Sequence, residues 1–524
     1  MKKLLIAIFV LFLTDASGSI HAQQKTPKPR IIITADPELD DLNSLIRFLL
    51  YSTDFKIEGL IYASSQFHWN GDGKGTKFMV PGREYTRYGL NLCPCESYRW
   101  KNDERFIHEA VEAYAKVYPN LIVHDKNYPT PAYLQSKIRY GNIEFEGDFS
   151  KDTEGSDLNK NVLMDDRPGP VYITAWGGQS TIARALKSIE LQHSESKAWQ
   201  SIKKKISQKL VILPSGDQDG TYASYIKPHW PDVEYRQFRS GPSYSYGAQL
   251  MGDKETAPYL TAEWMRANIS TKGPLGDLYR VWGDGKQMVK DDRFDYFGFD
   301  GYSNEQLKQM GYIVWMPVQP KGSWLGEGDT FTFMNLLDNG LNGWNKEFPG
   351  GWGGRIMTPE YVPAVDPFSS DTTKVKDLVI TDSILKANAA KKAEEADFPS
   401  FFPAAQQDFA IRMLWSITNK FTNANHAPQI KLLSNSLQQV VAGKKIFLNA
   451  TVNDPDGDKF TVKWWQFSRT KSEPTLIIEN DHALQTSVQA PATAKGKEFY
   501  LVLEVRDHSR IPLTSYKITR IVVR

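Results

Sequence analysis

The spacing of apolar and polar residues changes along the chain, and the change separates a first region of strands and helices from a later all-β region. Near the start, residues 30–34 form a short apolar run of strand type, and residues 39–50 place leucine and isoleucine at helical spacing. Residues 55–65 then form a second apolar run. Strand, helix and strand within about 30 residues predict a parallel βαβ unit.

The same alternation continues through the first two thirds of the chain. It predicts helices over 103–121 and 179–189, strands over 169–178, 209–219 and 311–318, and a loop leading into a helix over 328–341. Several of these strands end in glycine or acidic residues. In an open α/β sheet, ligands bind at the carboxyl ends of the strands, so we expect the functional site at those ends.

The sequence pattern changes after residue 357. Residues 358–424 are charged and helical in pattern, and residues 425–524 alternate with period two between turn-rich segments. We therefore predict an α/β domain over 30–357 with a mainly parallel sheet and flanking helices. A helical segment (358–424) packs on it, and an all-β, immunoglobulin-like sandwich (425–524) follows.

The N-terminus has the pattern of a secretory signal peptide over residues 1–22. Lys2 and Lys3 form the basic region, residues 4–13 the apolar stretch, and Ala22 a cleavage edge. The apolar stretch is shorter than the roughly 20 residues that span a bilayer. The sequence thus predicts a secreted or periplasmic protein.

The net charge and the number of cysteines exclude several classes of partner and of structural site. The formal net charge of +2 on 524 residues argues against nucleic acid or a membrane surface as the main partner. The only cysteines, Cys93 and Cys95, are separated by one residue. A disulfide between them would be strained, and two cysteines exclude a disulfide framework or a four-cysteine zinc site.

Three carboxylates crowd the end of the first predicted strand. Asp36 follows the strand, and Asp40 and Asp41 fall in the first turn of the next helix. Acidic residues favour helix N-termini through capping and the helix dipole, which accounts for one or two of them. A divalent cation would remove the mutual repulsion of all three, and hard oxygen ligands suit Ca²⁺.

The stretch "TADPELDD" carries this cluster and resembles the DxDPGxDD signature of the nucleoside hydrolases, calcium enzymes that cleave the N-glycosidic bond of ribonucleosides. The resemblance implies that Asp36 and Asp41 bind calcium, that Asp36 is also the general base, and that Asp40 holds a sugar hydroxyl. "WGGQSTIARAL" is similar to the Gly-rich turn whose backbone carbonyl reaches the metal, here at Ser180. "EGDT" is similar to the distal aspartate motif, which makes Asp329 the late carboxylate ligand.

Longer stretches point to one branch of that family. "YAKVYPNLIVHDKNYPTPAYLQSKIRYGN", "GEGDTFTFMNLLDNGL" and "GGWGGR" resemble secreted nucleoside-hydrolase-like proteins often labelled cellulose-binding, in which a C-terminal β-module follows. The chain departs from the nucleoside hydrolase pattern at Thr34, at Glu38 in place of glycine, and at Gly328, where purine-capable members carry histidine. These departures imply that the metal site is kept while the nucleoside site is changed.

The chemistry implied is hydrolysis of a glycosidic bond by metal-activated water. Asp36 would accept the proton, and Glu327 is the candidate acid for the leaving group, with a solvent-facing turn carboxylate as the alternative. His68 and Trp69, on the loop after the second strand, would contact a sugar, although a plain surface histidine fits equally.

A glycine-rich loop supplies two further candidates. Trp352 and Arg355, in "PGGWGGR", would line the site by stacking on a sugar and approaching its hydroxyls. The leading interpretation is a calcium-dependent hydrolase acting on a carbohydrate or nucleoside-like molecule. A carbohydrate-binding protein without turnover is the alternative, a β-module that serves only as a spacer is a third, and a homo-oligomer remains open.

Overall fold

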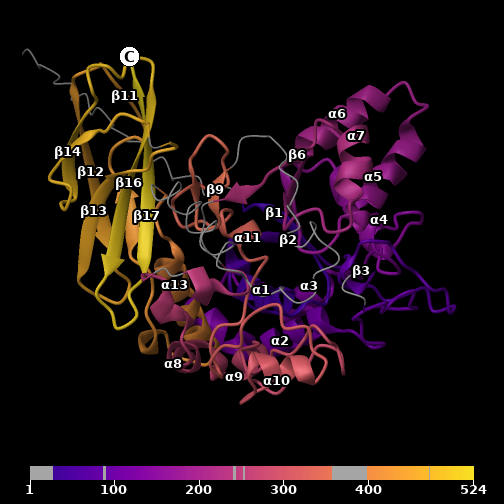
Figure 1. Cartoon of the computed structure of the whole chain (residues 1–524). Helices are drawn as coiled ribbons and strands as arrows, with labels where there is room; N and C mark the ends of the chain where they lie inside the picture. Colours follow the sequence, from indigo (N-terminus) through magenta and orange to yellow (C-terminus); the bar gives the residue numbers. More distant parts are fainter. Residues whose placement is uncertain (1–27, 87–89, 240–243, 252–253, 357–397, 471) are drawn as a thin grey trace, which may run out of the picture.

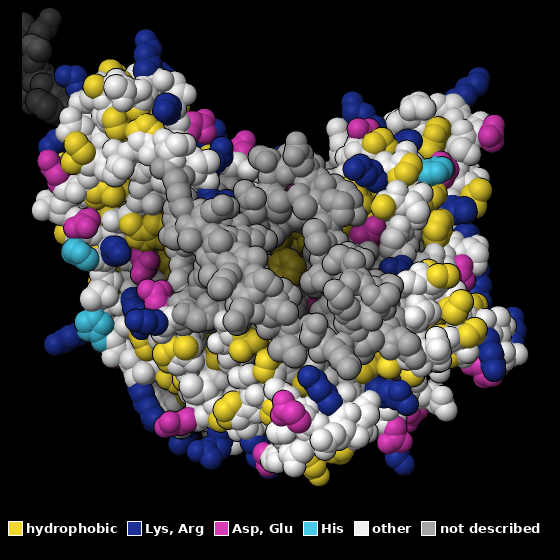
Figure 2. Space-filling model, viewed as in Figure 1, with side chains coloured by type: hydrophobic (Ala, Val, Ile, Leu, Met, Phe, Trp, Pro, Cys, Tyr) yellow, Lys and Arg dark blue, Asp and Glu magenta, His cyan; other side chains and the backbone are white. Residues whose placement is uncertain are grey.

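A computed structural model describes the chain except for residues 1–27, 87–89, 240–243, 252–253, 357–397 and 471. The predicted signal peptide (1–22) and most of the predicted helical segment (358–424) therefore lie outside the described residues. None of the described helices has both the length and the apolar character needed to cross a membrane. Over the face drawn in Figure 2, basic and acidic side chains of the described residues are interspersed, as the near-neutral net charge leads one to expect.

The first domain is built on a six-stranded parallel sheet in the order β3-β2-β1-β4-β5-β6 (Figure 1). Its strands are β1 (Arg30–Ala35), β2 (Lys56–Tyr62), β3 (Ile138–Tyr140), β4 (Val171–Ala175), β5 (Leu210–Pro214) and β6 (Glu234–Tyr235). The order reverses around β1, so the ends of β1 and β4 are the place where such sheets bind ligands.

Helices cover both faces of this sheet. They are α1 (Leu39–Leu50), α2 (Phe106–His124), α3 (Pro131–Gln135), α4 (Glu154–Met164), α5 (Ser180–His193), α6 (Trp199–Lys209) and α7 (Lys227–His229). Side chains alternate along β1: Ile31 and Ile33 join the core shared with α1 and α2, whereas Ile32 joins the core shared with α4, α5 and α6. The fold class predicted from the sequence is confirmed.

The segment from 257 to 356 is mostly irregular. It contains α8 (Ala262–Met265), α9 (Gly273–Leu278), α10 (Asn304–Gln309), α11 (Phe331–Met334), β8 (Gly350–Gly351) and β9 (Gly354–Ile356). The two strands form a small sheet with β7 (Phe238–Arg239), which lies earlier in the chain. The strand predicted over 311–318 is wrong. Val314 and Met316 are buried, but the Tyr296 hydroxyl, 2.7 Å from the Met316 nitrogen, satisfies the backbone in place of a neighbouring strand.

Helix α13 (Phe402–Ser416) connects the two parts of the molecule. It packs against α1, α2 and α9, and its buried residues are mainly apolar, with Gln406, Gln407 and Ser416 among them. In Figure 1 it lies between the α/β domain and the C-terminal strands.

The C-terminal domain is a sandwich of two four-stranded sheets, β10-β12-β15-β14 and β11-β17-β16-β13. The strands are β10 (Gln429–Leu432), β11 (Leu437–Val440), β12 (Lys445–Asn453), β13 (Phe460–Gln466), β14 (Ile477–Glu479), β15 (Gln485–Gln489), β16 (Glu498–Asp507) and β17 (Thr514–Val523). Its own core is Leu448, Trp464, Val488, Leu501 and neighbours. A second set of side chains of the sandwich, including Phe467, Tyr500 and Tyr516, belongs to the large core of the α/β domain.

Candidate functional site

Asp36 is fully buried at the position directly after β1. Its Oδ2 accepts hydrogen bonds from the Ser65 hydroxyl at 2.5 Å and lies 2.9 Å from Nδ1 of His68. Its backbone N–H donates to Oδ1 of Asp41 at 3.1 Å. Its own Oδ1 is buried and has no hydrogen-bond partner. A buried carboxylate oxygen without a partner is costly, which marks this atom as a position for a ligand.

Asp40 and Asp41 occupy the first turn of α1 and are also buried. Burial, opposed by a hydrogen bond from the Tyr246 hydroxyl at 3.1 Å, raises the pKa of Asp40 to about 6. The backbone N–H of Gly328 also donates to Asp40, at 3.1 Å. Burial, followed by repulsion from Asp329 and Asp36, raises the pKa of Asp41 well above its ordinary value.

Asp329 reaches the same place from a distant part of the chain. Its N–H donates to the Ser44 hydroxyl of α1 at 3.3 Å, and its side chain is 3% exposed. Burial, followed by repulsion from Asp40, raises the pKa of Asp329, while a hydrogen bond with Asp41 opposes the rise. Asp41 and Asp329 therefore meet through their carboxyl groups, as the resemblance to nucleoside hydrolases implies.

Glu38 adds a carboxylate that sequence reasoning treated only as a departure from the glycine of the motif. One oxygen of Glu38 lies within 4.8 Å of ligand atoms of Asp36 and His68, and likewise of Asp40 and Asp41. Burial and then Asp40 raise its pKa. The signal in the sequence was a fourth acidic residue within six positions.

His68 is buried beside Asp36 and is not a surface histidine. Because a carboxylate only accepts hydrogen bonds, the ring proton sits on Nδ1, and Nε2 carries a lone pair. Nε2 is buried without a partner. Burial, followed by the charge of Arg99, lowers the pKa of His68, so the ring is held neutral.

The donor set fits a hard divalent cation. Asp36, Asp41 and Asp329 bring three buried carboxylates together. Burial and mutual repulsion raise the pKa values of Asp41 and Asp329. The unpartnered Oδ1 of Asp36 supplies an open oxygen ligand. Oxygen ligands of this kind suit Ca²⁺ or Mg²⁺, and a neutral imidazole nitrogen is available in addition.

Glu327 has a role other than the proton donation predicted for it. It is fully buried in an ion pair with Arg47 of α1, whose Nε and Nη2 both donate to it, the latter at 3.0 Å. Tyr279 and Thr330 donate to its two oxygens at 2.6 and 2.9 Å. A carboxylate paired with a guanidinium and bonded on both oxygens has no proton to give, so Glu327 supports the fold beneath the site.

Ser180 is the first residue of α5, at the end of the turn after β4. Its N–H and that of Gln179 donate to Asp219 at 2.9 and 2.8 Å, which fixes the helix N-terminus. Carbonyls in the first turn of a helix accept bonds within that helix. From this turn the structure brings Gly177 against Asp36: a Cβ on Gly177 would lie 2.8 Å from Asp36 Oδ1.

The three aromatic and basic side chains predicted to contact sugar lie elsewhere. Trp69 is buried against Tyr85 and Tyr98, and Trp352 is 2% exposed in the large core. The Nη1 of Arg355 donates to the Ser468 carbonyl at 3.3 Å, which joins β9 to the sandwich. Trp69 was predicted from its loop position, and Trp352 and Arg355 from a glycine-rich loop that resembles one in the family.

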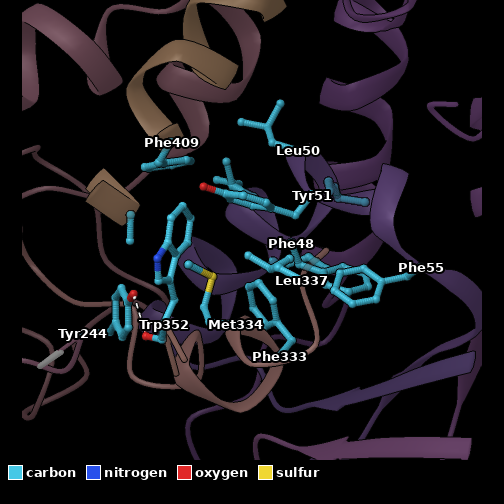
Figure 3. Close-up of a cluster of buried hydrophobic side chains, with 14 of the residues drawn as sticks. Phe48, Leu50, Tyr51, Phe55, Tyr244, Phe333, Met334, Leu337, Trp352 and Phe409 are labelled. Carbon is cyan, nitrogen blue, oxygen red and sulfur yellow. Dashed lines mark hydrogen bonds between the residues drawn. The ribbon is translucent and has the colours of Figure 1, made fainter. Parts of the chain in front are cut away.

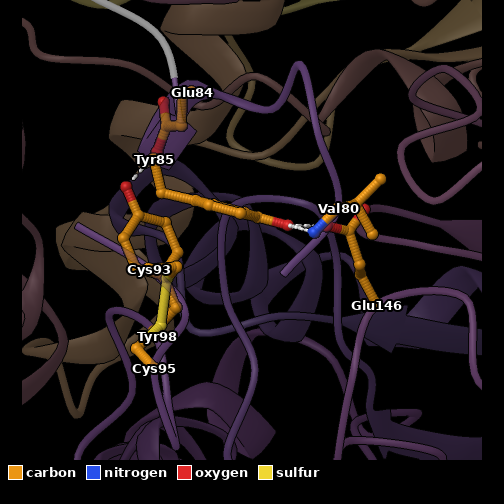
Figure 4. The surroundings of a disulfide bond; sticks show 7 residues. All are labelled: Val80, Glu84, Tyr85, Cys93, Cys95, Tyr98 and Glu146. Atoms are coloured by element: carbon orange, nitrogen blue, oxygen red, sulfur yellow. Dashed lines mark hydrogen bonds between the residues drawn. A yellow bond between two sulfur atoms is a disulfide. The ribbon is translucent and has the colours of Figure 1, made fainter. Parts of the chain in front are cut away.

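Cys93 and Cys95 are joined by a disulfide (Figure 4). Their Cα atoms lie 4.5 Å apart, within the range that disulfides span. Cys93 packs with Tyr85 and Tyr98 in the cluster around Trp69, on the loop that carries His68. The disulfide thus closes the small core behind the histidine.

Comparison with known proteins identifies the family. Residues 30–356 match the model of "Cellulose-binding Sde182, nucleoside hydrolase-like domain", and residues 445–524 match that of "Cellulose-binding protein Sde0182, C-terminal domain". The chain belongs to this family. No curated protein sequence matches it.

One solved structure that covers nearly the whole chain shares its fold. A nucleoside hydrolase-related hypothetical protein from Saccharophagus degradans, described as associated with carbohydrate metabolism, is 22% identical over 95% of this chain and 100% of its own, with a TM-score of 0.64. Murine CRIg is 14% identical over 19% of this chain and 99% of its own, with a TM-score of 0.15. The titin M3 domain is 15% identical over 18% of this chain and 96% of its own, with a TM-score of 0.14.

Proposed function

We propose that this family member is an exported, calcium-dependent hydrolase that cleaves an N- or O-glycosyl bond of a sugar-containing substrate. The observation that carries the proposal is the convergence of buried Asp36, Asp41 and Asp329, with Oδ1 of Asp36 left without a partner. The resemblance of "TADPELDD" to the nucleoside hydrolase signature and the family match support the reaction class.

Each residue of the site has a separate role in the proposed reaction. Asp36, Asp41 and Asp329 would hold the calcium ion, which when bound would supply the Lewis acidity for activating water at neutral pH. Asp36 accepts the proton, and the Nδ1 contact of His68 orients its carboxylate. Asp40, held by the hydroxyl of Tyr246 and the N–H of Gly328, is placed to accept a hydrogen bond from a sugar hydroxyl.

Carbohydrate binding without turnover is the second candidate function. The specific observation in its favour is Glu327, whose ion pair with Arg47 leaves no free acid at that position for the leaving group. The description of the family as cellulose-binding agrees with this alternative. Both functions use the same metal and sugar site, so turnover distinguishes them.

The test is calcium titration by calorimetry on the mature chain and on Asp41→Ala, alongside hydrolysis assays on nucleosides and aryl glycosides. Asp166→Ala is the matched control, because that carboxylate is fully exposed at the surface. Calcium binding and turnover that are both lost in Asp41→Ala alone would support the hydrolase. Calcium binding without turnover would favour the binding protein, and no calcium binding would refute the metal site.

A further inference from the structure

A chain of polar side chains crosses the junction between the α/β domain and the sandwich. The two domains also share a large apolar core, part of which, around Trp352 and Phe409, is drawn in Figure 3. The polar chain starts at His124, the last residue of α2. It continues through His426, between α13 and β10, to Asp456, in the turn between β12 and β13. Both histidines are buried, so their ring nitrogens need partners within the protein.

Hydrogen bonds join these side chains end to end. Nε2 of His124 lies 2.8 Å from the carbonyl oxygen of Thr418, and Nδ1 of His124 lies 3.1 Å from Nε2 of His426. Nδ1 of His426 lies 3.1 Å from each carboxylate oxygen of Asp456, and the backbone N–H of His426 donates to the same carboxylate at 2.7 Å. The chain therefore has an acceptor at each end, a carbonyl after α13 and a carboxylate on the sandwich.

The two acceptors at the ends fix the number of ring protons. A carbonyl and a carboxylate only accept hydrogen bonds, so Nε2 of His124 and Nδ1 of His426 each carry a proton. The contact between the two rings needs a third proton, because one nitrogen must donate and the other accept. Two neutral imidazoles hold only two ring protons. The complete chain therefore holds one extra proton, and one of the rings is an imidazolium.

The surroundings place that positive charge on His426. Burial lowers the pKa of His124, although the hydrogen bond to the Thr418 carbonyl opposes this shift. His426 instead faces the carboxylate of Asp456, and its ring stacks on Phe421 with the ring centres 3.5 Å apart. A carboxylate and the face of an aromatic ring both stabilise a cation.

Other charged groups around the pair already have partners. Arg412 of α13 lies over the ring of Trp415, which stacks on both histidines, and its Nε contacts Asp408 at 2.8 Å. Asp507 of the sandwich accepts hydrogen bonds from two backbone N–H groups, each at 3.0 Å. Asp456 is therefore the carboxylate that balances the imidazolium.

We propose that the chain of His124, His426 and Asp456 is a proton-dependent contact that strengthens the docking of the sandwich on the α/β domain. At mildly acidic pH the extra proton completes all three contacts. When the pH rises and the proton leaves, two ring protons serve three contacts, so one contact pairs two acceptors, and a buried unpaired acceptor is costly. The stabilisation is thus present at the lower pH and lost as the pH rises, within the range of about 5 to 8 in which histidine changes charge. This contact does not depend on the proposed hydrolase centre.

NMR of the chain labelled with ¹⁵N-histidine tests the number of protons directly, with His124→Gln and His426→Gln to assign the signals. At about pH 5.5 we expect both ring nitrogens of His426 to carry protons and His124 to carry one, on Nε2. Raising the pH to about 8 should remove one proton from His426 and leave one on His124. His229, which is 47% exposed beside Glu190, provides the surface reference.

Thermal unfolding tests whether the proton stabilises the junction. The difference in unfolding temperature between the parent and Asp456→Asn should be largest near about pH 5.5 and should shrink toward about pH 8, where the carboxylate no longer balances a charge. His229→Gln, which removes an exposed pair, should have little effect at either pH.

Two results would overturn the proposal. One is a single ring proton on His426 at about pH 5.5, since the chain would then be incomplete. The other is a difference between the parent and Asp456→Asn that stays constant over this pH range. The spectrum of the parent decides the first point even where a variant is too unstable to measure, and calcium binding or turnover at the acidic cluster has no bearing on either.

Discussion

Replacing Glu327 with glutamine is the sharpest test of how the site is supported. Glu327 and Arg47 are both 0% exposed, and Arg47 donates to both carboxylate oxygens. Glu327→Gln keeps the shape but removes the negative charge, so a guanidinium is left uncompensated in the core. Breaking a buried pair in this way costs about 3–5 kcal/mol. Urea unfolding followed by tryptophan fluorescence should show that loss in the free energy of unfolding.

A surface pair provides the control. Asp300 and Lys321 contact each other at 2.9 Å, but their side chains are 48% and 64% exposed. Asp300→Asn should therefore change the free energy of unfolding by no more than about 1 kcal/mol. If Glu327→Gln is equally mild and instead abolishes turnover at full stability, the structural role is refuted and Glu327 returns as the proton donor.

Three further predictions concern single side chains. Hydrogen bonding to Arg184 lowers the pKa of Asp152 to about 2, so its stabilisation is complete above pH 4 and is lost as the pH falls toward 2. The difference in urea midpoint between the parent and Asp152→Asn should shrink over that range; a constant difference would contradict this. Trp69→Ala should cost about 3–5 kcal/mol of unfolding free energy, measured by the same urea titration, because it empties a core position. Arg355→Ala should lower stability by about 1–2 kcal/mol through its lost bond to Ser468, with calcium binding unchanged by calorimetry.

The parts of the fold that follow from local pattern were predictable. Residues 30–50 contain a strand, a turn and a helix whose apolar spacing is complete within the segment, and the structure has β1 and α1 there. The exposed and buried alternation of the sandwich is equally local. Asp36, Asp40 and Asp41 come together for the same reason, because one strand end and one helix turn position all three.

The role of Glu327 could not be read from its neighbours. Its partner Arg47 lies 280 positions earlier, in the last turn of the largely apolar helix α1. An arginine surrounded by apolar residues is the one signal in the sequence, since a buried guanidinium requires a carboxylate. Sequence spacing alone gives no means of choosing which carboxylate that is.

Aromatic residues in loops were the other source of error. Trp69 and Trp352 each follow small or polar residues, which suggested exposure, yet both rings are buried by segments far away in the chain. The run 311–318 was apolar enough for a strand, and the side chains of Val314 and Met316 are indeed buried. Apolar pattern predicts burial there, whereas strand formation also needs a neighbouring backbone with free hydrogen-bonding groups.

The core that the sandwich shares with the first domain has a consequence for modularity. Tyr500, Val502 and Tyr516 belong to the same apolar cluster as Phe48 and Trp352, and Gly340 approaches the Tyr516 carbonyl so closely that any Cβ would collide with it. A domain joined to its neighbour only by a flexible linker can be removed without exposing a buried surface. A domain whose inner face completes its neighbour's interior cannot be exchanged without exposing that interior, so the two halves of this chain are expected to be inherited, expressed and degraded together.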